Sequence, residues 1–326
     1  MPDHGTYAPI GIERDTSRAE SHFGLVGTRV TAPWGSAYAR HLPIRRGDVA
    51  TVFLHGASGS WTGWTPLLEA AGRQNIPLPK PVLIDLPGWG DGVLRASVLR
   101  LTIHDICTLV GAVLDRLGYA RWHLVGHSMG GLIALHLAAT SPERVVAVGV
   151  VSGTSFSVIR SVEHPLREFW SVPAFTMLWR VMGVLRSLGA VGRSMLRAAT
   201  ALGIMRVVFA PLFRHGFRVP RSVVLATVDG IDPHAFLAAA EVVRGYDAAT
   251  LWTNIRCPVN ALSGDRDVFV GAHDLEDLAQ TVRHAVISVI AECGHFALIE
   301  WPHHTLVALG FTSVTEEAAD PRNSPS

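Results

Sequence analysis

The stretch WHLVGHSMGGL, residues 122–132, determines the fold expected for this chain. An apolar run with strand character leads into a Gly-x-Ser-x-Gly turn at Gly126, Ser128 and Gly130, and a helical pattern follows from Met129 to about Thr140. A sharp strand-to-helix turn forces its central serine into a strained backbone conformation, and the flanking glycines leave room for the two segments to pass closely. The Ser128 hydroxyl would then lie at a helix N-terminus, where unpaired N–H groups favour a developing negative charge.

Length and composition indicate one folded core with an insertion. The chain has 326 residues, more than one ordinary domain, of which 48% are hydrophobic and 17% charged. Such values are typical of a well-buried globular protein rather than a disordered chain. The net charge of +1 implies no general nucleic-acid partner. Lys80 is the only lysine, which favours a GC-rich bacterial genome as the source.

The cysteines and the N-terminal residues indicate the cellular compartment in which we expect the protein. Cys107, Cys257 and Cys293 are far apart and odd in number, so we expect neither a disulfide framework nor a metal site, and a reducing cytoplasm as the setting. Residues 1–21 contain acidic side chains and no apolar segment, unlike a secretory signal peptide. We expect no transmembrane helix.

Strand and helix patterns alternate on both sides of a less regular middle segment. We expect an antiparallel hairpin at 23–31 and 36–43, strands at 48–54, 81–86, 144–151, 259–263 and 285–291, and helices at 103–117, 129–140, 248–255, 274–282 and after 295 to about 309. This alternation predicts an α/β fold, a mostly parallel sheet with helices on both faces.

Five segments are predicted along the chain. Residues 1–22 form a polar, mobile N-terminal segment, and residues 313–326 form a disordered tail. The α/β core comprises residues 23–154 and 247–312, and residues 155–246 form the insertion.

Five motifs occur in the order in which one superfamily has them. They are His55-Gly56 followed by Trp61 and Trp64, Asp85-x-x-Gly88-x-Gly90, the Ser128 turn, Gly264-x-x-Asp267, and Gly294-His295 followed by Glu300-x-Pro302. On these residues the chain resembles the α/β-hydrolase fold superfamily, in its serine-nucleophile, esterase- and lipase-like branch with a helical cap. The resemblance covers roughly residues 23–311 and is weakest across the insertion, which is similar to the cap of such enzymes. It implies no cofactor.

The chemistry of a serine nucleophile identifies the other candidate catalytic residues. A serine hydroxyl needs a histidine to take its proton, and that imidazole needs an acid to hold its tautomer. His295 follows the last predicted strand on a Gly-His loop, whereas His127 is interpreted as a packing residue. The resemblance places the acid three residues after a glycine, at Asp267, and leaves Asp265 as a turn former. The order Ser128, Asp267, His295 is that of the superfamily.

The resemblance also implies an oxyanion hole, formed by the backbone N–H groups of Ala57 and Met129. Two tryptophans near it, Trp61 and Trp64, either line the acyl pocket or belong to the core. Asp85 belongs to a structural turn next to the site.

The predicted cap is basic and apolar. Residues 155–225 hold ten arginines against Glu163 and Glu168, a local charge of about +8. Arg186, Arg193 and Arg197 are spaced as on one face of a helix. One interpretation is a solvated arginine face over an apolar, pocket-lining face. The other is that the cap contacts an anionic membrane surface, or receives a lipophilic substrate with a negative head group.

These features predict a carboxylesterase- or lipase-like enzyme that cleaves an ester of an apolar acyl group through an acyl-enzyme. Haloalkane dehalogenases and epoxide hydrolases, which resemble the chain elsewhere, carry aspartate where Ser128 lies. Two alternatives remain open. A hydrolase of carbon–carbon bonds in ring-cleavage products would use the same triad, with a cap arginine to bind a carboxylate. A non-catalytic ligand receptor could keep the same residues.

Overall fold

A nine-stranded sheet forms the centre of the molecule in the computed structural model, which describes residues 16–44, 47–98, 101–219 and 221–312. In spatial order its strands are β1 (Val26–Ala32), β2 (Gly35–His41), β4 (Pro81–Asp85), β3 (Val49–Leu54), β6 (Arg121–His127), β7 (Val145–Val151), β8 (Val259–Gly264) and β9 (Ala285–Ile290), with the short β5 (Val93–Leu94) paired to β2.

In this spatial order the strands from β4 to β9 pair in parallel, and the antiparallel pairs among the described residues are β1–β2, β2–β4 and β2–β5. The predicted mostly parallel α/β fold is therefore confirmed. Leu54, the last residue of β3, lies opposite Gly126 near the end of β6. Because parallel strands end at the same edge, the loop after β3 begins next to the Ser128 turn.

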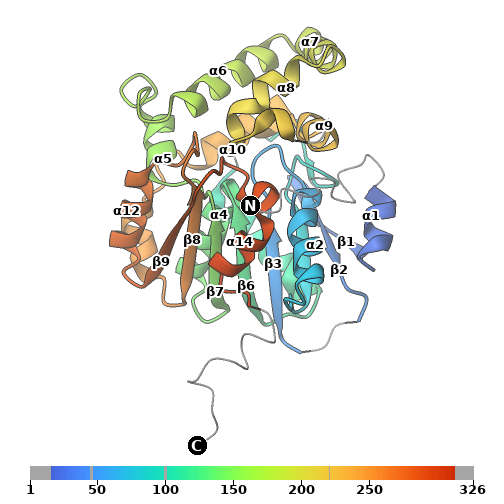
Figure 1. The fold of residues 1–326 in the computed structure, drawn as a ribbon, viewed down its shortest axis with the longest axis vertical. Helices are drawn as coiled ribbons and strands as arrows, with labels where there is room; N and C mark the ends of the chain where they lie inside the picture. The colour runs from blue at the N-terminus through green and yellow to red at the C-terminus, as the bar shows by residue number, and fades with distance from the viewer. Residues whose placement is uncertain (1–15, 45–46, 99–100, 220, 313–326) are drawn as a thin grey trace, which may run out of the picture.

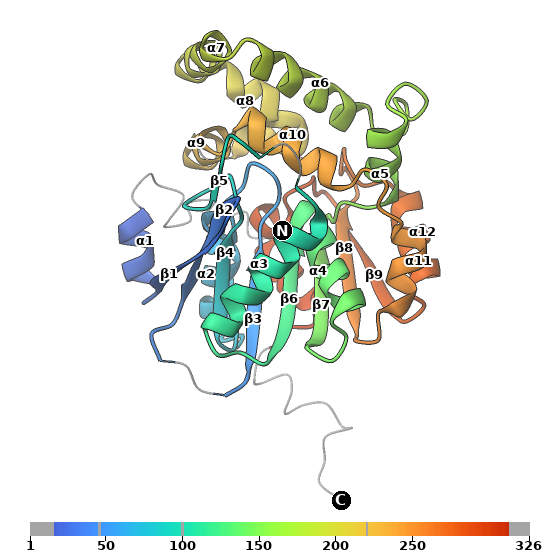
Figure 2. The ribbon, with the colours of Figure 1, turned by 180° about the vertical axis from the view of Figure 1, so that it is seen from behind.

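Helices cover both faces of this sheet (Figures 1 and 2). On one face lie α2 (Thr65–Arg73), which follows the 3-10 turn Trp61–Trp64, and the C-terminal helices α13 (Ala297–Glu300) and α14 (Pro302–Ala308). On the other lie α3 (Ile103–Arg116), α4 (Met129–Thr140) and α11 (Ala248–Leu251) with its 3-10 turn Trp252–Asn254. The remaining core helix, α12 (Ala272–Thr281), packs beside β9.

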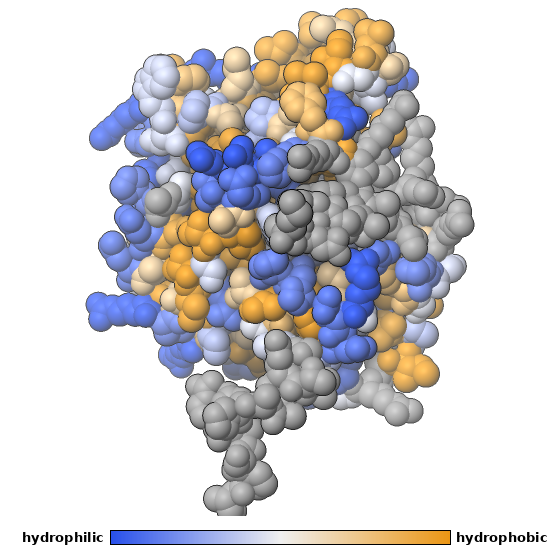
Figure 3. Space-filling model, in the orientation of Figure 1, coloured by the Kyte–Doolittle hydropathy of each residue, from blue (hydrophilic) through white to orange (hydrophobic). Residues whose placement is uncertain are grey.

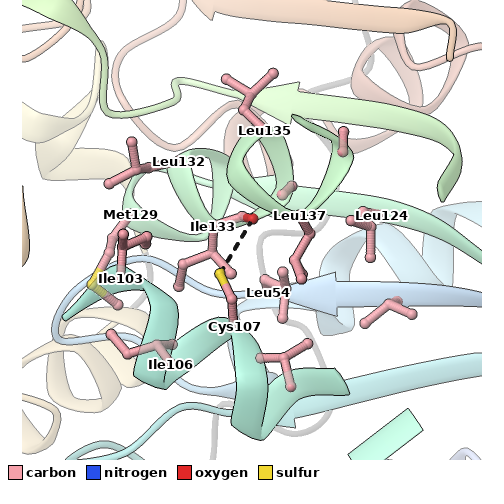
Figure 4. Packing of buried hydrophobic residues seen from close by; sticks show 14 of the residues in the cluster. Leu54, Ile103, Ile106, Cys107, Leu124, Met129, Leu132, Ile133, Leu135 and Leu137 are labelled. Carbon is pink, nitrogen blue, oxygen red and sulfur yellow. Dashed lines mark hydrogen bonds between the residues drawn. The ribbon is translucent and has the colours of Figure 1, made fainter. Parts of the chain in front are cut away.

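The helix after Ser128, α4, is enclosed by the core, with every residue from Met129 to Ala139 buried. Figure 4 shows it against α3, where the Cys107 thiol points at the Ile133 carbonyl oxygen at 3.9 Å. A helix that is apolar all round is stable only when buried in this way. The start of α4 is therefore held firmly by its surroundings.

In the described part of the chain, six helices lie over the carboxyl ends of the strands, at the top of Figure 1. They are α5 (Phe156–Glu163), α6 (Pro173–Ser187), α7 (Ala190–Ala201), α8 (Ile204–Phe209), α9 (Arg221–Asp229) and α10 (Pro233–Val242), with 3-10 turns at Ala210–Leu212 and Gly216–Arg218. We call residues 156–242 the cap. In the described residues no single helix has the length and apolar character to cross a membrane; α7 together with Ile204–Leu212 passes the same test only as a pair bent by 89°.

The structure differs from the sequence-based expectations in three places. Residues 16–22, expected to be mobile, form helix α1 (Thr16–His22), because Ala19 is buried and the Glu20 carboxylate accepts a hydrogen bond from Arg40 at 2.6 Å. Arg186 does not share a helix with Arg193 and Arg197, because α6 ends before Gly189, which has a φ of +54°. The single helix expected between 295 and about 309 is instead two helices, α13 and α14, with Trp301 between them. The rest of the predicted N-terminal segment, 1–15, and the predicted tail, 313–326, lie outside the described residues.

Candidate active site

Ser128 lies between β6 and α4, at φ 51° and ψ −119°, a conformation that L-residues rarely adopt. Its backbone N–H donates to the Val151 carbonyl oxygen at 3.0 Å. A β-carbon on Gly126 would come within 2.2 Å of the Gly130 carbonyl oxygen, and one on Gly130 within 2.0 Å of the Leu54 carbonyl oxygen. The two glycines are thus required by close backbone approach, as their spacing around Ser128 predicts.

His295 lies on the loop between β9 and α13, and its Nδ1 is 2.9 and 3.0 Å from the two carboxylate oxygens of Asp267. The Asp267 side chain is fully buried and also accepts hydrogen bonds from the N–H groups of Phe269 and Val270, at 2.8 and 3.2 Å. Burial alone would raise the pKa of Asp267, but His295 and these hydrogen bonds hold it below its ordinary value. An ionised Asp267 places the His295 proton on Nδ1 and leaves Nε2 free to accept one.

The neighbouring Asp265 has a different role. Its carboxylate accepts a hydrogen bond from the Cys293 N–H at 3.1 Å and makes no contact with the His295 ring. Of the two candidate acids, the structure brings only Asp267 to the histidine.

Ser128 and His295 line one cavity beneath the cap, which holds about 940 Å³ of space including its open mouth. Apart from these residues and His127, its walls are apolar or carry only hydroxyl groups: Ala57, Ser58, Met129, Ser152, Thr154, Val158, Phe175, Leu178, Met182, Phe209, Leu212, Thr227, Ile231, Phe236, Ala239, Ala240, Val243, Phe269, Val270 and Phe296. Among the side chains that the structure describes, no Arg, Lys, Asp or Glu lines the cavity. The cavity suits an apolar group bound next to a serine hydroxyl.

Ala57 and Met129, the residues expected to supply oxyanion donors, both line this cavity. Within the part of the chain that the structure describes, neither backbone N–H has a hydrogen-bond partner. Met129 is the first residue of α4, so its N–H belongs to the unpaired group at a helix N-terminus. Both amides are therefore available to an oxygen atom bound near Ser128.

Two buried side chains hold the loop that carries Ala57. His55 donates from Nδ1 to the Gly56 carbonyl oxygen at 2.7 Å and accepts at Nε2 from the Leu86 N–H at 2.9 Å. Asp85 accepts from the Trp61 N–H at 2.7 Å and pairs with Arg40 at 2.6 Å. The structural role expected for Asp85 thus takes a specific form, since it connects the ends of the loop to the core.

Trp61 and Trp64 do not line the Ser128 cavity, which corrects the suggestion that they form an acyl pocket. Trp61 lies against the Arg40 guanidinium at 4.8 Å, and Trp64 packs on Phe53 at 5.2 Å. Trp64 borders only a smaller neighbouring cavity. Both indoles are buried because the 3-10 turn that carries them faces the core.

Two further residues support the histidine loop. His127 donates from Nε2 to the His295 carbonyl oxygen at 3.1 Å, and burial together with the nearby His295 lowers the pKa of His127 to about 3, so that its ring is neutral. Glu300 accepts from the Gly294 and Arg214 N–H groups at 3.0 and 2.7 Å. The sequence predicted a packing role for His127 and placed Glu300 in a motif without a role. It did not predict the hydrogen bonds by which the two residues hold the loop of His295.

The cap contributes directly to the same loop. The Leu212 carbonyl oxygen accepts from the His295 N–H at 2.8 Å, and the Arg214 guanidinium donates to Glu292 at 3.0 Å. We call these contacts, with the Arg214–Glu300 hydrogen bond, the cap clamp. It joins a segment of the insertion to the backbone of His295, the candidate catalytic histidine.

In the described residues no group of three or more His, Cys, Asp or Glu side chains is arranged to hold a metal ion. The three cysteines are buried and unpaired. Burial raises the pKa of the Cys107 thiol above its ordinary range, which leaves it protonated.

Comparison with known proteins gives both sequence and structural relatives. Residues 51–308 match the model of the alpha/beta hydrolase family. A 2-hydroxy-6-oxononadienedioate/2-hydroxy-6-oxononatrienedioate hydrolase of Burkholderia vietnamiensis is 35% identical over 108 residues, 33% of this chain and 37% of that protein. The dihydrolipoyllysine-residue acetyltransferase component of the acetoin cleaving system of Pseudomonas putida is 32% identical over 109 residues, 32% of this chain and 27% of that protein.

The chain thus matches well under half the length of these curated relatives. Among solved structures, a carboxylesterase from Bacillus subtilis superposes with a TM-score of 0.67 at 18% identity, covering 91% of this chain and 94% of the other. At that identity the likeness concerns the fold alone.

Proposed function

Because the chain belongs to the alpha/beta hydrolase family, we propose that it is a serine hydrolase that cleaves a carboxylic ester of an apolar acyl group through an acyl-enzyme. The observation that carries this proposal is the cavity around Ser128, whose walls, over the residues that the structure describes, bear no Arg, Lys, Asp or Glu side chain. An apolar acyl chain gains free energy by leaving water for such walls, whereas a carboxylate or ammonium group would lose hydration without a partner.

The proposed reaction begins when the Ser128 oxygen attacks the ester carbonyl carbon and His295 Nε2 takes the hydroxyl proton. The carbonyl oxygen becomes an oxyanion, which accepts hydrogen bonds from the Ala57 and Met129 N–H groups. Asp267, held ionised by its contacts, stabilises the imidazolium. His295 then gives the proton to the departing alcohol, and the acyl group stays on Ser128. A water molecule, deprotonated by His295, attacks this acyl-enzyme and releases the carboxylic acid.

Replacing Ser128 with alanine tests the nucleophile. We expect Ser128→Ala to lower kcat on an activated aryl ester by about 10⁴-fold or more, because alanine has no hydroxyl group that could attack the ester carbonyl carbon. A fluorophosphonate probe should label the wild-type protein and leave Ser128→Ala unlabelled. Ser155→Ala is a matched control, since Ser155 is buried outside the cavity and makes no side-chain capping hydrogen bond. Wild-type turnover by Ser128→Ala in a folded protein would refute the mechanism.

A panel of aryl esters tests the acyl group. We expect kcat/KM to rise from acetate to medium-chain acyl esters as more apolar surface is buried. The gain is about 0.8 kcal/mol, or roughly fourfold, per methylene that the cavity encloses. A hemisuccinate ester, which ends in a carboxylate, should be a poor substrate. Equal turnover of the hemisuccinate and an apolar ester of matched length would argue against the apolar-acyl proposal.

A second candidate, hydrolysis of a carbon–carbon bond in a ring-cleavage product, is favoured by the 35% identity to a hydrolase of that kind over 108 residues. The same triad could perform it. Such substrates carry carboxylates, however, and no Arg or Lys side chain lines the cavity in the part of the chain that the structure describes. Turnover of a vinylogous diketo acid without turnover of simple esters would favour this candidate. Slow single-turnover labelling together with a ligand-dependent partner would instead favour a receptor.

A further inference from the structure

Helix α6 of the cap is apolar on more than its inner face. Phe175, Leu178 and Met182 line the cavity above Ser128. A second stripe at spacings of four, three and four residues continues past the helix end and is exposed: Met177 by 60%, Val181 by 44%, Val184 by 58% and Leu188 by 41%. A helix that is apolar on several faces is ordinarily enclosed by protein. In α6 the second stripe is left uncovered.

The next two helices of the cap repeat this pattern. Along and just after α7, Val191, Met195 and Leu202 are exposed by 60, 54 and 75%, at spacings of four and seven residues. On α8, Ile204, Val207 and Val208 are exposed by 48, 63 and 53%. Figure 3 shows apolar residues gathered at the top of the molecule, where Figure 1 places α7 and α8. We call the exposed apolar residues of α6, α7 and α8, with those that directly follow these helices, the cap surface.

The segment of chain that forms the cap surface carries charges of one sign only. Between Glu168 and Asp229 the chain contains eight arginines and no aspartate or glutamate. Four of these arginines are exposed and, among the described residues, have no ion pair: Arg180, Arg186, Arg193 and Arg197. Arginine extends its apolar stem along apolar surface while its guanidinium reaches polar groups, which is how basic helices lie at a lipid interface.

From this combination we propose that the cap surface binds an anionic phospholipid bilayer, with its apolar residues in the acyl region and its arginines at the phosphates. Charge favours this occupant over a second copy of the chain. A two-fold contact between two cap surfaces would set arginines against arginines with no carboxylate to pair them, at a cost in free energy. A bilayer with acidic head groups meets both the apolar and the positive character of the surface.

Docking would also place the catalytic cavity next to the lipid phase. Helix α6 contributes one stripe to the cap surface and another to the wall of the cavity that Ser128 lines. An apolar ester dissolved in the bilayer could then be taken up without crossing water. This substrate route rests on the proposed function, whereas the docking itself does not. The two are therefore tested separately.

Docking is tested by flotation of the folded Ser128→Ala protein with vesicles, so that hydrolysis plays no part. One set of vesicles is phosphatidylcholine alone, and the other contains phosphatidylglycerol as well. We expect preferential binding to the anionic set, weakened by added salt. Arg193→Gln combined with Arg197→Gln should weaken it by about fivefold per arginine. Arg283→Gln, an exposed arginine of the core, is the control and should bind as before.

The contribution of the apolar residues to vesicle binding is tested by a second pair of variants, one on the cap surface and one on the core. Val184→Asp, on α6 and 58% exposed, should reduce vesicle binding at least about tenfold, because it sets a carboxylate in the acyl region and opposes anionic lipid. Val307→Asp, on core helix α14 and 47% exposed, makes the same change elsewhere and should leave binding unaltered. Circular dichroism spectra identical to that of the parent protein establish that each variant is folded.

Other outcomes would overturn the proposal. Equal binding to neutral and anionic vesicles would do so, as would binding that the cap variants and their controls reduce alike. A dimer in sedimentation equilibrium that Val184→Asp dissociates, with no vesicle binding, would assign the surface to a second copy. If docking holds, wild-type turnover of a water-insoluble ester should rise when anionic vesicles carry it. Docking without any ester turnover would refute the proposed function and leave the docking intact.

Discussion

Asp267 determines which nitrogen of His295 holds the proton. Its two oxygens lie 2.9 and 3.0 Å from Nδ1, and the N–H groups of Phe269 and Val270 hold the carboxylate in place. An ionised acid can only accept at this position, so Nε2 is left free to accept a proton. In the proposed mechanism the acid acts on Ser128 through the tautomer of the histidine.

Replacing Asp267 with asparagine should therefore impair catalysis far more than folding. The amide can donate to Nδ1, which favours the tautomer with the proton on Nε2, and we expect kcat to fall by about 10⁴-fold. Asp265→Asn, two residues away on the same turn, is the control and should retain most of the activity. Steady-state kinetics on one aryl ester decides between them. A larger loss from Asp265→Asn than from Asp267→Asn would reverse the assignment of the acid.

At the residue scale, the candidate site residues that lie in a sequence motif could be identified from the sequence. Residues that support the site through a contact with a distant part of the chain could not. Ser128, Asp267 and His295 each follow a glycine-bearing pattern at the end of a predicted strand. His127 and Glu300 act on residues 168 and 86 positions away, His295 and Arg214 respectively. No local spacing encodes such contacts. For the same reason the sequence could not decide whether Trp61 and Trp64 line the pocket or belong to the core. Burial of a tryptophan at the start of a helix depends on which residues pack over it.

At the element scale, the turn between β6 and α4 has the least steric freedom. Gly130→Ala should lower the free energy of unfolding by at least about 3 kcal/mol, because the new β-carbon would overlap the Leu54 carbonyl oxygen of the neighbouring strand. Gly72→Ala is the matched helical control on α2. A β-carbon there meets nothing within 4 Å, and we expect stabilisation of about 0.5–1 kcal/mol. Urea unfolding of both variants measures the difference, and similar effects would contradict the steric argument.

Core elements were easier to predict than the cap. The predicted helix at 129–140 matches α4, and the predicted strand at 259–263 is one residue shorter than β8. Buried parallel strands and helices between them carry continuous apolar runs that bound each element. In the cap, apolar residues occur on both the cavity side and the exposed side of α6, so periodicity gives no single inner face. The expected alignment of Arg186 with Arg193 failed because Gly189 ends the helix there.

At the scale of the whole molecule, buried neutral histidines set the response to acid. Burial lowers the pKa of His123 to about 4 and, with the nearby His295, that of His127 to about 3. In the unfolded chain these groups titrate near 6.5, so below that pH the unfolded state binds more protons than the folded state. Their contribution to stability is complete above about pH 6.5 and is lost as the pH falls toward the folded values.

The free energy of unfolding should therefore fall by about 1.4 kcal/mol per pH unit for each such histidine below pH 6.5. His123→Gln should remove one histidine's share of this slope between about pH 6 and 5. His273→Gln is the control, because the His273 side chain is 91% exposed in the folded protein. Urea titrations across this range measure the slopes. Equal slopes for the two variants would contradict the assignment of His123.

The cap clamp has a consequence for the timing of turnover. The Leu212 carbonyl oxygen holds the backbone N–H of His295, and Glu300 joins the Arg214 N–H to that of Gly294. Lifting this end of the cap would break hydrogen bonds to the loop that carries His295, the proposed general base. The base would then be displaced whenever that end is raised. Loading a bulky substrate by this route and performing the chemistry would be successive phases of the cycle, never simultaneous ones.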